Sequence, residues 1–414
     1  MVKSILLAPI PKSPFPFPFY MRTSCLVLSL LLFLIAPNLW AQPDVEKKLQ
    51  TAFILAEEGA TIVLPAGKIT LSNTLSLDEK KGVTIKGAGE GKTILSFLGQ
   101  QQGAEGLRVT NAENIVLQDF TIEDSKGDLI KTLQVRHIIF RNITARWNGD
   151  PKKENGAYAI YPIQCTNVTI DHCTAIGASD SGIYVGQSDS VWVKNCTAQN
   201  NVAGIEIENT THSWVFDNTA IDNTGGILVF DLPDLPKKEG GHCKVFHNQI
   251  LHNNFQNFAP KGNIVGKVPA GTGVMVLAAN NVEVYDNQIL DNKTVSVAIV
   301  SYFVAETPIH DTLYNPYPRA ISIHSNHFSK GKRMPSRKSQ LGFLFWLKFG
   351  RRVPHIIYDG IQNPDYLAAA GTLQAAYQIC VRNNENASFA NVRLGEKRFL
   401  FKKPYRDSKP YDCD

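Results

Sequence analysis

The chain has 414 residues, of which 43% are hydrophobic and 19% are charged, with 30 glycines and 22 prolines. This composition supplies enough apolar side chains for a large core and excludes an intrinsically disordered protein. The 42 basic and 37 acidic residues give a formal net charge of +5. So small an excess excludes a histone-like polycation, and no nucleic-acid partner is expected.

Residues 1–41 have the pattern of a secretory signal peptide. They contain three basic residues and no acid, and the apolar stretch from Leu26 to Ala36 is too short to span a bilayer. We expect cleavage after Ala41 and export to the periplasm or the extracellular space, with an N-terminal membrane anchor as the alternative. Met21 would by itself begin a signal of ordinary length, so the start of the chain stays open.

The residues that follow the signal have a helical pattern and then a solenoid pattern. A helical segment at 45–58 precedes the first short strands. We expect this helix to cap the end of the fold, because a solenoid needs such a cap to keep its terminal core from water and its edge from pairing.

The middle of the chain repeats every 22 or 23 residues. Successive units begin at Ile160, Ile183, Ile205 and Ile227, which are 23, 22 and 22 residues apart. Each unit has short alternating strands, a polar turn and a corner occupied by Asn or Cys. Such units are typical of a parallel β-solenoid, in which each full turn, called a coil below, buries its inward face against the next. We expect about nine coils over residues 42–329.

The corner position of the repeat is occupied mostly by asparagine. We expect the Asn amides to hydrogen-bond at the corners and to stack from coil to coil. Two neighbouring corners carry Cys173 and Cys196, which we interpret as buried small residues and not as a functional thiol pair. The corner positions in chain order are Asp119, Asn142, Cys173, Cys196, Asn218, Asn248, Asn287 and Asn326.

The repeats resemble those of the pectate-lyase-like superfamily. More narrowly, the segments SDSGIYVGQS, NVAGIEIEN, NTGGILVFDLPDL, VPHIIYDGI, ICVRNN and SFANV resemble a family of exported bacterial β-helix proteins without an established function. The resemblance implies an all-β fold, a single-stranded right-handed parallel β-helix. It covers the chain from about residue 45 to its end and implies no active site residue by residue.

A row of carboxylates is the candidate catalytic group. Strand alternation points Glu206 and Glu208 outward on one strand, and Asp231 aligns one coil away beside Glu208. Outward residues two apart on a strand are about 6.5 to 7 Å apart, a separation suited to a general acid and a general base in glycoside hydrolysis. We expect an exposed stripe that acts as an acid/base group. Calcium binding through the same oxygens and two merely solvated glutamates are the alternatives.

Two tyrosines and two lysines near the carboxylates are candidate substrate-binding residues. Tyr161 and Tyr184 precede the carboxylates on the same outward stripe and offer rings to sugar faces. Lys237 and Lys238 lie in an insertion at 232–241 that is expected to overhang the stripe and to meet substrate carboxylates.

Other chemistry-bearing residues are interpreted as structural. Asp180 and Ser181 precede a glycine and are expected to satisfy the amides of their own turn. The pair Asp171 and His172 is read as a polar turn beside the corner positions. The histidines His242, His247 and His252 are spaced five and five apart, which fits no metal motif, so no metal and no cofactor other than calcium is considered.

From Lys330 to the end the repeat pattern fails. We expect residues 330–414 to form an irregular basic extension, with 16 basic and 7 acidic residues, that docks on the solenoid or contacts an anionic envelope surface. The apolar segment LGFLFWLKFGRR is either an end-capping or a surface-inserting helix. Since export permits disulfides, Cys380 and Cys413 are the expected pair.

These observations leave three functional readings. The first is an exported protein that binds or processes an acidic polysaccharide by lyase, epimerase or hydrolase chemistry. The second is a non-catalytic β-helix that binds a glycan or a protein through the same stripe. The third is a periplasmic accessory protein for a redox or metal enzyme. The fold resemblance favours sugar chemistry by analogy.

Overall fold

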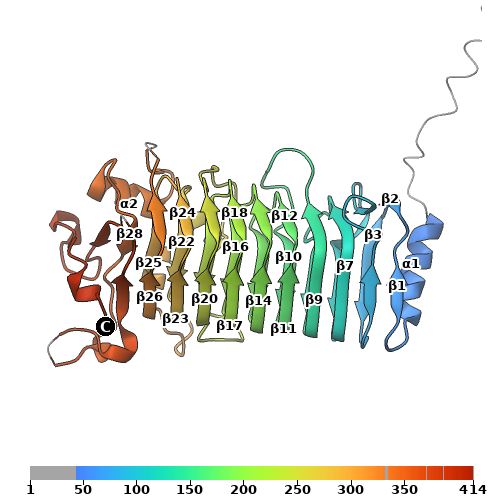
Figure 1. The fold of residues 1–414 in the computed structure, drawn as a ribbon, viewed down its shortest axis with the longest axis horizontal. Coiled ribbons are helices and arrows are strands. Elements are labelled where there is room, and N and C mark those ends of the chain that lie inside the picture. Colours follow the sequence, from blue (N-terminus) through green and yellow to red (C-terminus); the bar gives the residue numbers. More distant parts are fainter. Residues whose placement is uncertain (1–42, 332–333, 370, 386, 414) are drawn as a thin grey trace, which may run out of the picture. The chain divides into compact units, whose positions relative to one another are not determined.

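The computed structural model describes residues 43–331, 334–369, 371–385 and 387–413. The expected signal peptide lies outside these residues. The described part of the chain is a parallel β-helix in which every strand pairing is parallel, as Figure 1 shows. It contains no helix that is long and apolar enough to cross a membrane.

Each coil in the middle of the solenoid consists of three strands and tight corners. One coil contains β13 (Ser181–Gly186), β14 (Asp189–Lys194) and β15 (Thr197–Gln199). In the next coil Ile205 lies directly beside Ile183, at the register that the repeat spacing predicts. Both side chains are fully buried, because alternate residues of each strand point into the coil and stack on the coils above and below.

Two parallel sheets line the coils, and the smaller one, sheet B, has 11 strands. The strands of sheet B are β3 (Asn73–Asp78), β6 (Gln102–Thr110), β8 (Ile130–Leu133), β10 (Tyr158–Ile163), β13, β16 (Ala203–Glu208), β19 (Gly225–Phe230), β22 (Thr272–Leu277), β25 (Val295–Val300), β28 (Ile356–Tyr358) and β30 (Phe389–Asn391).

The larger sheet, sheet A, has 19 strands and contributes the other sides of the coils. Its strands are β1 (Thr61–Val63), β2 (Gly67–Thr70), β4 (Thr84–Lys86), β5 (Thr93–Ser96), β7 (Glu113–Glu123), β9 (Arg136–Arg146), β11 (Thr166–Asp171), β12 (Thr174–Ile176), β14, β15, β17 (Thr211–Phe216), β18 (Thr219–Ile221), β20 (Gly241–Phe246), β21 (Gln249–Leu251), β23 (Asn280–Tyr285), β24 (Gln288–Leu290), β26 (Arg319–His324), β27 (His327–Ser329) and β29 (Ile379–Arg382).

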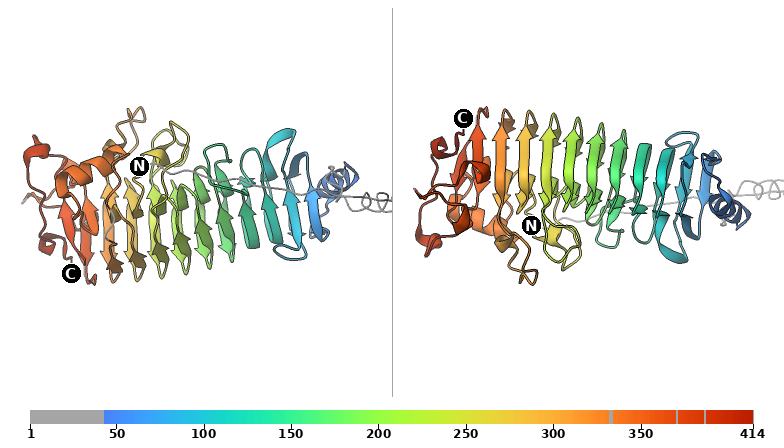
Figure 2. Two further views of the ribbon diagram at one scale, coloured as in Figure 1. Left: turned by 90° about the horizontal axis from the view of Figure 1, so that it is seen from above. Right: turned by 90° about the horizontal axis from the view of Figure 1, so that it is seen from below.

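Helices occupy the start of the described chain, the segments between late strands and the segment after β30. The α-helices are α1 (Pro43–Leu55) and α2 (Gln340–Phe349). The short 3-10 helices are η1 (Ile264–Lys267), η2 (Tyr302–Ala305), η3 (Pro364–Tyr366), η4 (Ala375–Tyr377), η5 (Phe399–Phe401) and η6 (Lys409–Tyr411). Figure 2 shows that the long yellow and orange loops project from the same side of the coils.

Helix α1 lies against the first coil, where the sequence predicts a cap. It buries Leu49 and Phe53 in the core of the solenoid. The side chain of Gln50 hydrogen-bonds both backbone groups of Ser76 on β3, each at 2.9 Å. The helix therefore satisfies strand groups that would otherwise face water at the end of sheet B.

The asparagines at the corners form a hydrogen-bonded ladder, as the sequence predicts. The amide of Asn218 donates to Asn248 at 3.0 Å, and the ladder continues through the next corners to Asn384. A second ladder of Asn201, Asn223, Asn253 and Asn292 runs parallel to it and is also buried. Each amide both donates and accepts, so that the polar groups of the corners stay satisfied inside the fold.

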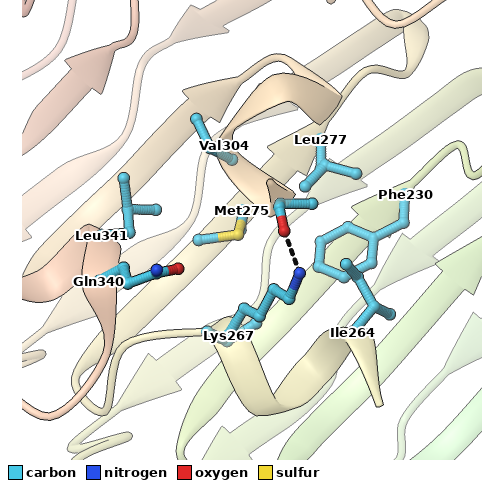
Figure 3. Close-up of a pocket in the computed structure, with 10 residues that line it drawn as sticks. Phe230, Ile264, Lys267, Met275, Leu277, Val304, Gln340 and Leu341 are labelled. Carbon is cyan, nitrogen blue, oxygen red and sulfur yellow. Dashed lines mark hydrogen bonds between the residues drawn. The ribbon is translucent and has the colours of Figure 1, made fainter. Parts of the chain in front are cut away.

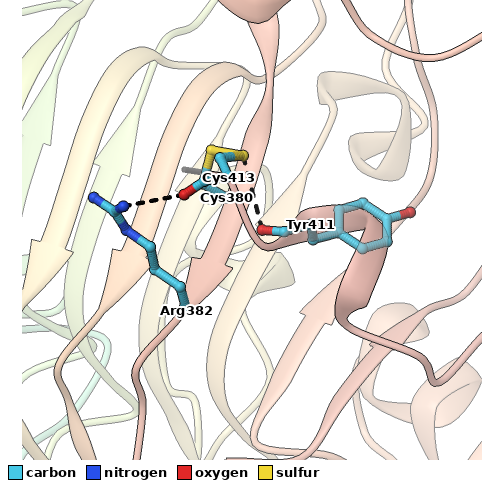
Figure 4. The surroundings of a disulfide bond; sticks show 4 residues. All are labelled: Cys380, Arg382, Tyr411 and Cys413. Carbon is cyan, nitrogen blue, oxygen red and sulfur yellow. Dashed lines mark hydrogen bonds between the residues drawn. A yellow bond between two sulfur atoms is a disulfide. The ribbon is translucent and has the colours of Figure 1, made fainter.

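The C-terminal segment is less irregular than the sequence predicts. Strands β28, β29 and β30 extend both sheets beyond residue 330, and sheet B thereby has 11 strands where about nine coils are expected. The expected boundary is wrong because these strands have only three or four residues and irregular spacing, which hides the repeat. A disulfide joins Cys380 on β29 to Cys413 (Figure 4).

Helix α2 covers the side of the solenoid and not its end. Its residues Leu341, Phe345 and Phe349 are buried in a second apolar cluster, which lies on the outer face of sheet B. This cluster also contains Met275 and Leu277, which point outward from β22. Of the two roles considered for this segment, end-capping is therefore wrong.

Candidate functional site

The carboxylates lie on the outer face of sheet B at the register that the sequence predicts. Glu206 pairs with Tyr184 on one side and with Leu228 on the other. Glu208 occupies the next outward position and pairs with Gly186. The carboxylates are thus flanked by tyrosines toward the N-terminal coils and by apolar residues toward the C-terminal coils.

The expected exposure of this stripe is wrong. Glu206 and Asp231 are each 1% exposed, and Glu208 is 7% exposed. Long insertions and α2 cover the C-terminal part of the face and bury it in the second apolar cluster. Figure 3 shows part of this cover, where Ile264, Lys267, Val304 and Leu341 enclose a small apolar cavity over the outward side chains of sheet B.

Glu206 is part of a buried group of three hydroxyl and carboxyl side chains. The Ser181 hydroxyl donates to Glu206 Oε2 and lies 3.1 Å from Asp180 Oδ1. The second Asp180 oxygen accepts a hydrogen bond of 2.7 Å from Asn263, which lies in the covering loop at 256–270. Glu206 Oε1 is buried without a hydrogen-bond partner among the described residues. Burial and the neighbouring Asp180 and Glu208 carboxyls raise the pKa of Glu206 well above its usual range.

Glu208 is held by a tyrosine from the neighbouring coil. The Tyr184 hydroxyl donates to Glu208 Oε1 at 2.6 Å. Burial raises the pKa of Glu208 to about 7, although the hydrogen bond from Tyr184 acts in the opposite direction. This carboxyl therefore gains and loses its proton near neutral pH, as a general acid or base requires.

Three tyrosine rings are packed together beside Glu208. The ring centroids of Tyr158 and Tyr184 are 4.4 Å apart, and Tyr161 lies 4.5 Å from Tyr158. Tyr158 and Tyr161 are half-buried, and the Lys131 ammonium lies 5.0 Å from the Tyr161 ring centroid. The tyrosine cluster, comprising Tyr158, Tyr161 and Tyr184, thus forms the edge of the site that reaches the surface.

Asp231 closes the site at the end of β19. Its Oδ1 accepts a hydrogen bond of 2.8 Å from the Gly240 amide, and its backbone oxygen accepts one of 2.5 Å from the Tyr314 hydroxyl. Burial raises the pKa of Asp231 to about 7 and that of Asp180 to about 6. The acid row, defined as Asp180, Glu206, Glu208 and Asp231, therefore carries less negative charge at neutral pH than four solvated carboxylates would.

The two lysines expected to meet substrate are engaged within the fold. Lys238 forms an ion pair with Asp311. Lys237 donates to the Ser188 carbonyl and to Thr211 Oγ1, the latter at 2.7 Å. Both lysines therefore fasten the 232–240 insertion to neighbouring segments.

Sequence reasoning missed three members of the site. The Asp180 side chain accepts a hydrogen bond from Asn263, and the Ser181 side chain donates one to Glu206. The expectation that both side chains bond the amides of their own turn is therefore wrong. Tyr158 was not singled out, although it pairs with Ser181 across the strands and precedes Tyr161 by three residues. The 23-residue spacing of the repeat implies this pairing and could have placed Tyr158 in the site.

The histidines at 242, 247 and 252 do not converge on one point. His242 lies on β20, His247 between β20 and β21, and His252 after β21. His247 and His252 lie 3.8 to 3.9 Å from aspartate oxygens of neighbouring coils. Within the described ranges, no group of three or more His, Cys, Asp or Glu side chains is placed to hold a metal ion. Asp171 and His172 hydrogen-bond to each other at 2.7 Å beside the corner ladder.

Comparisons with known proteins concern the fold. The family model described as the right-handed β-helix region matches residues 81–235 and 152–304, which together span more than half of the chain. The A-module of the mannuronan C-5 epimerase AlgE4 from Azotobacter vinelandii superimposes with a TM-score of 0.51 and 15% identity, over 85% of this chain and 92% of that one. An alginate lyase from Paenibacillus sp. strain FPU-7 gives a TM-score of 0.47 and 14% identity, over 68% of this chain and 93% of that one.

A relative in sequence is the pre-neck appendage protein of Bacillus phage B103. It is 24% identical over 208 residues, which make up 41% of this chain. The chain spans only 24% of the length of that protein.

Proposed function

This chain belongs to the right-handed β-helix family, and from that premise we propose that it processes an acidic polysaccharide by proton transfer at the Tyr184–Glu208 pair. The observation that carries the proposal is the 2.6 Å hydrogen bond between the Tyr184 hydroxyl and Glu208 at the inner edge of the tyrosine cluster. The pair lies between half-buried aromatic rings and a buried row of acids.

The pair supplies an acid and a base within one hydrogen bond. A lyase and an epimerase both begin by removing a proton from the uronate carbon that bears the carboxylate. A lyase then protonates the glycosidic oxygen as its bond to the neighbouring carbon breaks, and an epimerase returns a proton to the opposite face of the first carbon. Glu208, with a pKa raised by burial to about 7, is suited to accept the first proton. Tyr184, whose pKa burial raises well above its usual range, keeps its proton at neutral pH and is suited to donate it.

The rings of Tyr158 and Tyr161 are proposed to contact the sugar. They are half-buried, and they join an apolar face to a polar tip, as sugar rings do. The AlgE4 module shares this fold and is named as an epimerase of mannuronan, which supports a uronate polymer as the substrate class.

The experiment is an assay of the purified protein on polymannuronate and polygalacturonate. We measure unsaturated ends, new reducing ends and deuterium uptake from heavy water. Unsaturated ends report elimination, new reducing ends without unsaturated ends report hydrolysis, and deuterium uptake without new ends reports epimerisation. The Glu208→Gln and Tyr184→Phe variants are expected to lose activity by about 100-fold or more. Glu283→Gln is the matched control, because Glu283 is a partly exposed glutamate on β23 of the other sheet.

Absence of all three signals with the wild-type protein would overturn the catalytic proposal. The second candidate, a glycan-binding protein without catalysis, is favoured by the near-complete burial of Glu206 and Asp231. In that case polyuronate binding persists in the Glu208→Gln variant while no product forms.

We also propose that the chain is exported. The signal pattern at residues 1–41 and the Cys380–Cys413 disulfide both fit an oxidising compartment. Mass spectrometry of the protein recovered from periplasm and medium tests this proposal. A mature chain that begins at Gln42 is expected, and recovery of the uncleaved chain from the cytosol contradicts it.

The C-terminal segment is proposed to contact an anionic envelope surface. Leu347, Leu400 and Phe401 are 53%, 53% and 90% exposed. Lys348 donates to the Leu400 carbonyl at 3.1 Å, which holds the exposed side chains of α2 and η5 together. The exposed basic residues Lys397, Arg398 and Lys403 flank η5. Phe401→Asp is expected to abolish salt-sensitive adsorption to phosphatidylglycerol vesicles, and adsorption equal to the wild type would contradict it.

A further inference from the structure

A hollow lined by cations opens beside the acid row. It has a volume of about 1050 Å³ and lies between the covering loop at 256–270 and the segment that leads into α2. Its size is at the upper end of ordinary ligand sites. Its cationic lining residues are Lys261, Lys267, Lys293, Arg337 and Lys338. None of its lining residues, all within the described chain, is Asp or Glu.

Four of the five cations of the hollow form no ion pair with an acid of the described chain. Lys267 donates to the Ala305 carbonyl and to Thr307 Oγ1, which are uncharged. In the described part of the chain, no ion pair involves Lys261, Lys267, Arg337 or Lys338. Cations gathered in a concave surface reinforce one another's potential and favour an anionic ligand.

The other groups of the hollow suit a sugar more closely than a simple anion. The exposed amide of Gln256 and the hydroxyl of Ser336 line it beside the cations. Phe343, 47% exposed, adds an apolar ring at its edge. Carboxylates, hydroxyls and an apolar ring face are together the groups of a uronate, which makes this the ligand that the lining fits.

The hollow is joined to the acid row by one side chain. Asn263 lines the hollow, and its amide donates to Asp180 Oδ2 at 2.7 Å. Asp180 Oδ1 lies 3.1 Å from the Ser181 hydroxyl, which donates to Glu206 Oε2. A ligand in the hollow is therefore separated from the acid row by the covering loop alone.

We infer that this hollow binds an oligouronate through its carboxylates, with Lys261, Arg337 and Lys338 as the principal cations. The inference rests on the proposed function for its substrate class and assigns it a second contact surface. It gives the covering loop at 256–270 a role in holding a polymer chain beside the acid row.

The test compares two triple variants that remove the same charge. Lys261→Ala/Arg337→Ala/Lys338→Ala alters the hollow, and Lys48→Ala/Lys152→Ala/Lys153→Ala removes three exposed cations elsewhere. Binding of tetra- to hexamers of galacturonate and mannuronate is measured by titration calorimetry at low and physiological salt. The hollow variant is expected to bind about 10- to 100-fold more weakly than the wild type, and the control variant as tightly as the wild type.

Equal affinity of the two triple variants would overturn the inference, as would equal binding of cellohexaose, which carries no charge. The inference would also be overturned if the wild-type protein bound no oligouronate and the hollow variant lost adsorption to phosphatidylglycerol vesicles. That result would identify an anionic lipid site. Measuring activity and oligouronate binding on the same wild-type protein separates the two proposals. Retained oligouronate binding with an inactive wild-type protein contradicts the proposed catalysis and leaves the hollow as a binding site.

Discussion

The Tyr184 hydroxyl reaches Glu208 by passing its ring over Gly186, the residue that pairs with Glu208 across the strands. A Cβ placed on Gly186 would lie 2.5 Å from the ring and 2.6 Å from its hydroxyl oxygen. Glycine is therefore needed at this position for steric reasons, since any side chain would displace the tyrosine. The hydrogen bond depends on three residues from two coils.

The first prediction follows from this packing. Gly186→Ala is expected to move the Tyr184 ring and to reduce activity as strongly as Tyr184→Phe, which is about 100-fold. Gly395→Ala is the control, because a Cβ there meets its neighbours at 3.4 Å or more. Turnover of Gly186→Ala at the wild-type rate would show that the hydrogen bond is dispensable.

A second prediction concerns the pKa of Glu208. The hydrogen bond from Tyr184 favours the carboxylate and holds the pKa of Glu208 below the value that burial alone would give. Tyr184→Phe is therefore expected to raise the pKa of Glu208 by about one unit or more. The acid limb of the pH–rate profile should move to higher pH by that amount. Tyr161→Phe serves as the control, and an unmoved limb in Tyr184→Phe would contradict the assignment of Glu208 as the base.

The third prediction is a fall in stability as the pH rises. Burial raises the pKa of Asp231 to about 7 in the folded protein, while its pKa in the unfolded chain is about 3.9. Between these values the folded state holds the extra proton, so the free energy of unfolding is highest at acidic pH and decreases toward neutrality. Asp231→Asn should flatten this slope by up to about 1.4 kcal/mol per pH unit.

The matched control is Asp189→Asn. Burial acts to raise the pKa of Asp189, but hydrogen bonds from Thr211, His212 and Ser190 outweigh it and hold that pKa at about 2. Asp189 is therefore ionised throughout the range from about pH 5 to about pH 7, and the variant should change stability equally at both pH values. Urea unfolding at both pH values measures the slopes, and parallel curves for wild type and Asp231→Asn would contradict a raised pKa.

The repeat in the sequence was sufficient to predict the coils, the strand register and the corner ladder. Ile183 and Ile205 are adjacent as their spacing predicts, and Asn218 and Asn248 are bonded despite a 30-residue interval between them. Spacing is informative here because each coil contacts its immediate neighbours. The burial of the carboxylates was not predictable in this way. The Tyr314–Asp231 hydrogen bond joins residues 83 apart, through insertions that have no repeat.

The fourth prediction concerns the buried asparagines. Asn223 donates to Asn253 and accepts from Asn201, so replacing it by alanine leaves unpaired groups on both sides. Asn223→Ala is expected to lower the free energy of unfolding by about 2 to 4 kcal/mol. Asn384 ends the other ladder and is only half-buried, so Asn384→Ala should cost less. Equal losses, measured by chemical denaturation, would show that position in the ladder is irrelevant.

The fifth prediction concerns calcium, the one cation considered for the acid row. Burial raises the pKa of Glu206, Glu208 and Asp231, so that these groups share protons at neutral pH and offer little negative charge. EDTA is therefore expected to leave the Tm and the activity unchanged. A rise in Tm on addition of calcium chloride, and its loss in Glu208→Gln, would identify a calcium site instead.

The Cys380–Cys413 disulfide has a consequence for self-association. The strands of the last coils present backbone groups that a further strand can pair with, and this invites end-to-end growth of filaments. The crosslink fixes the C-terminus against β29, while Tyr411 packs its ring 4.7 Å from Phe389 on β30 and Tyr405 bridges to Asn391. The terminal strand edge is thus shielded by the chain's own tail, and its protection against polymerisation depends on the redox state of the surroundings.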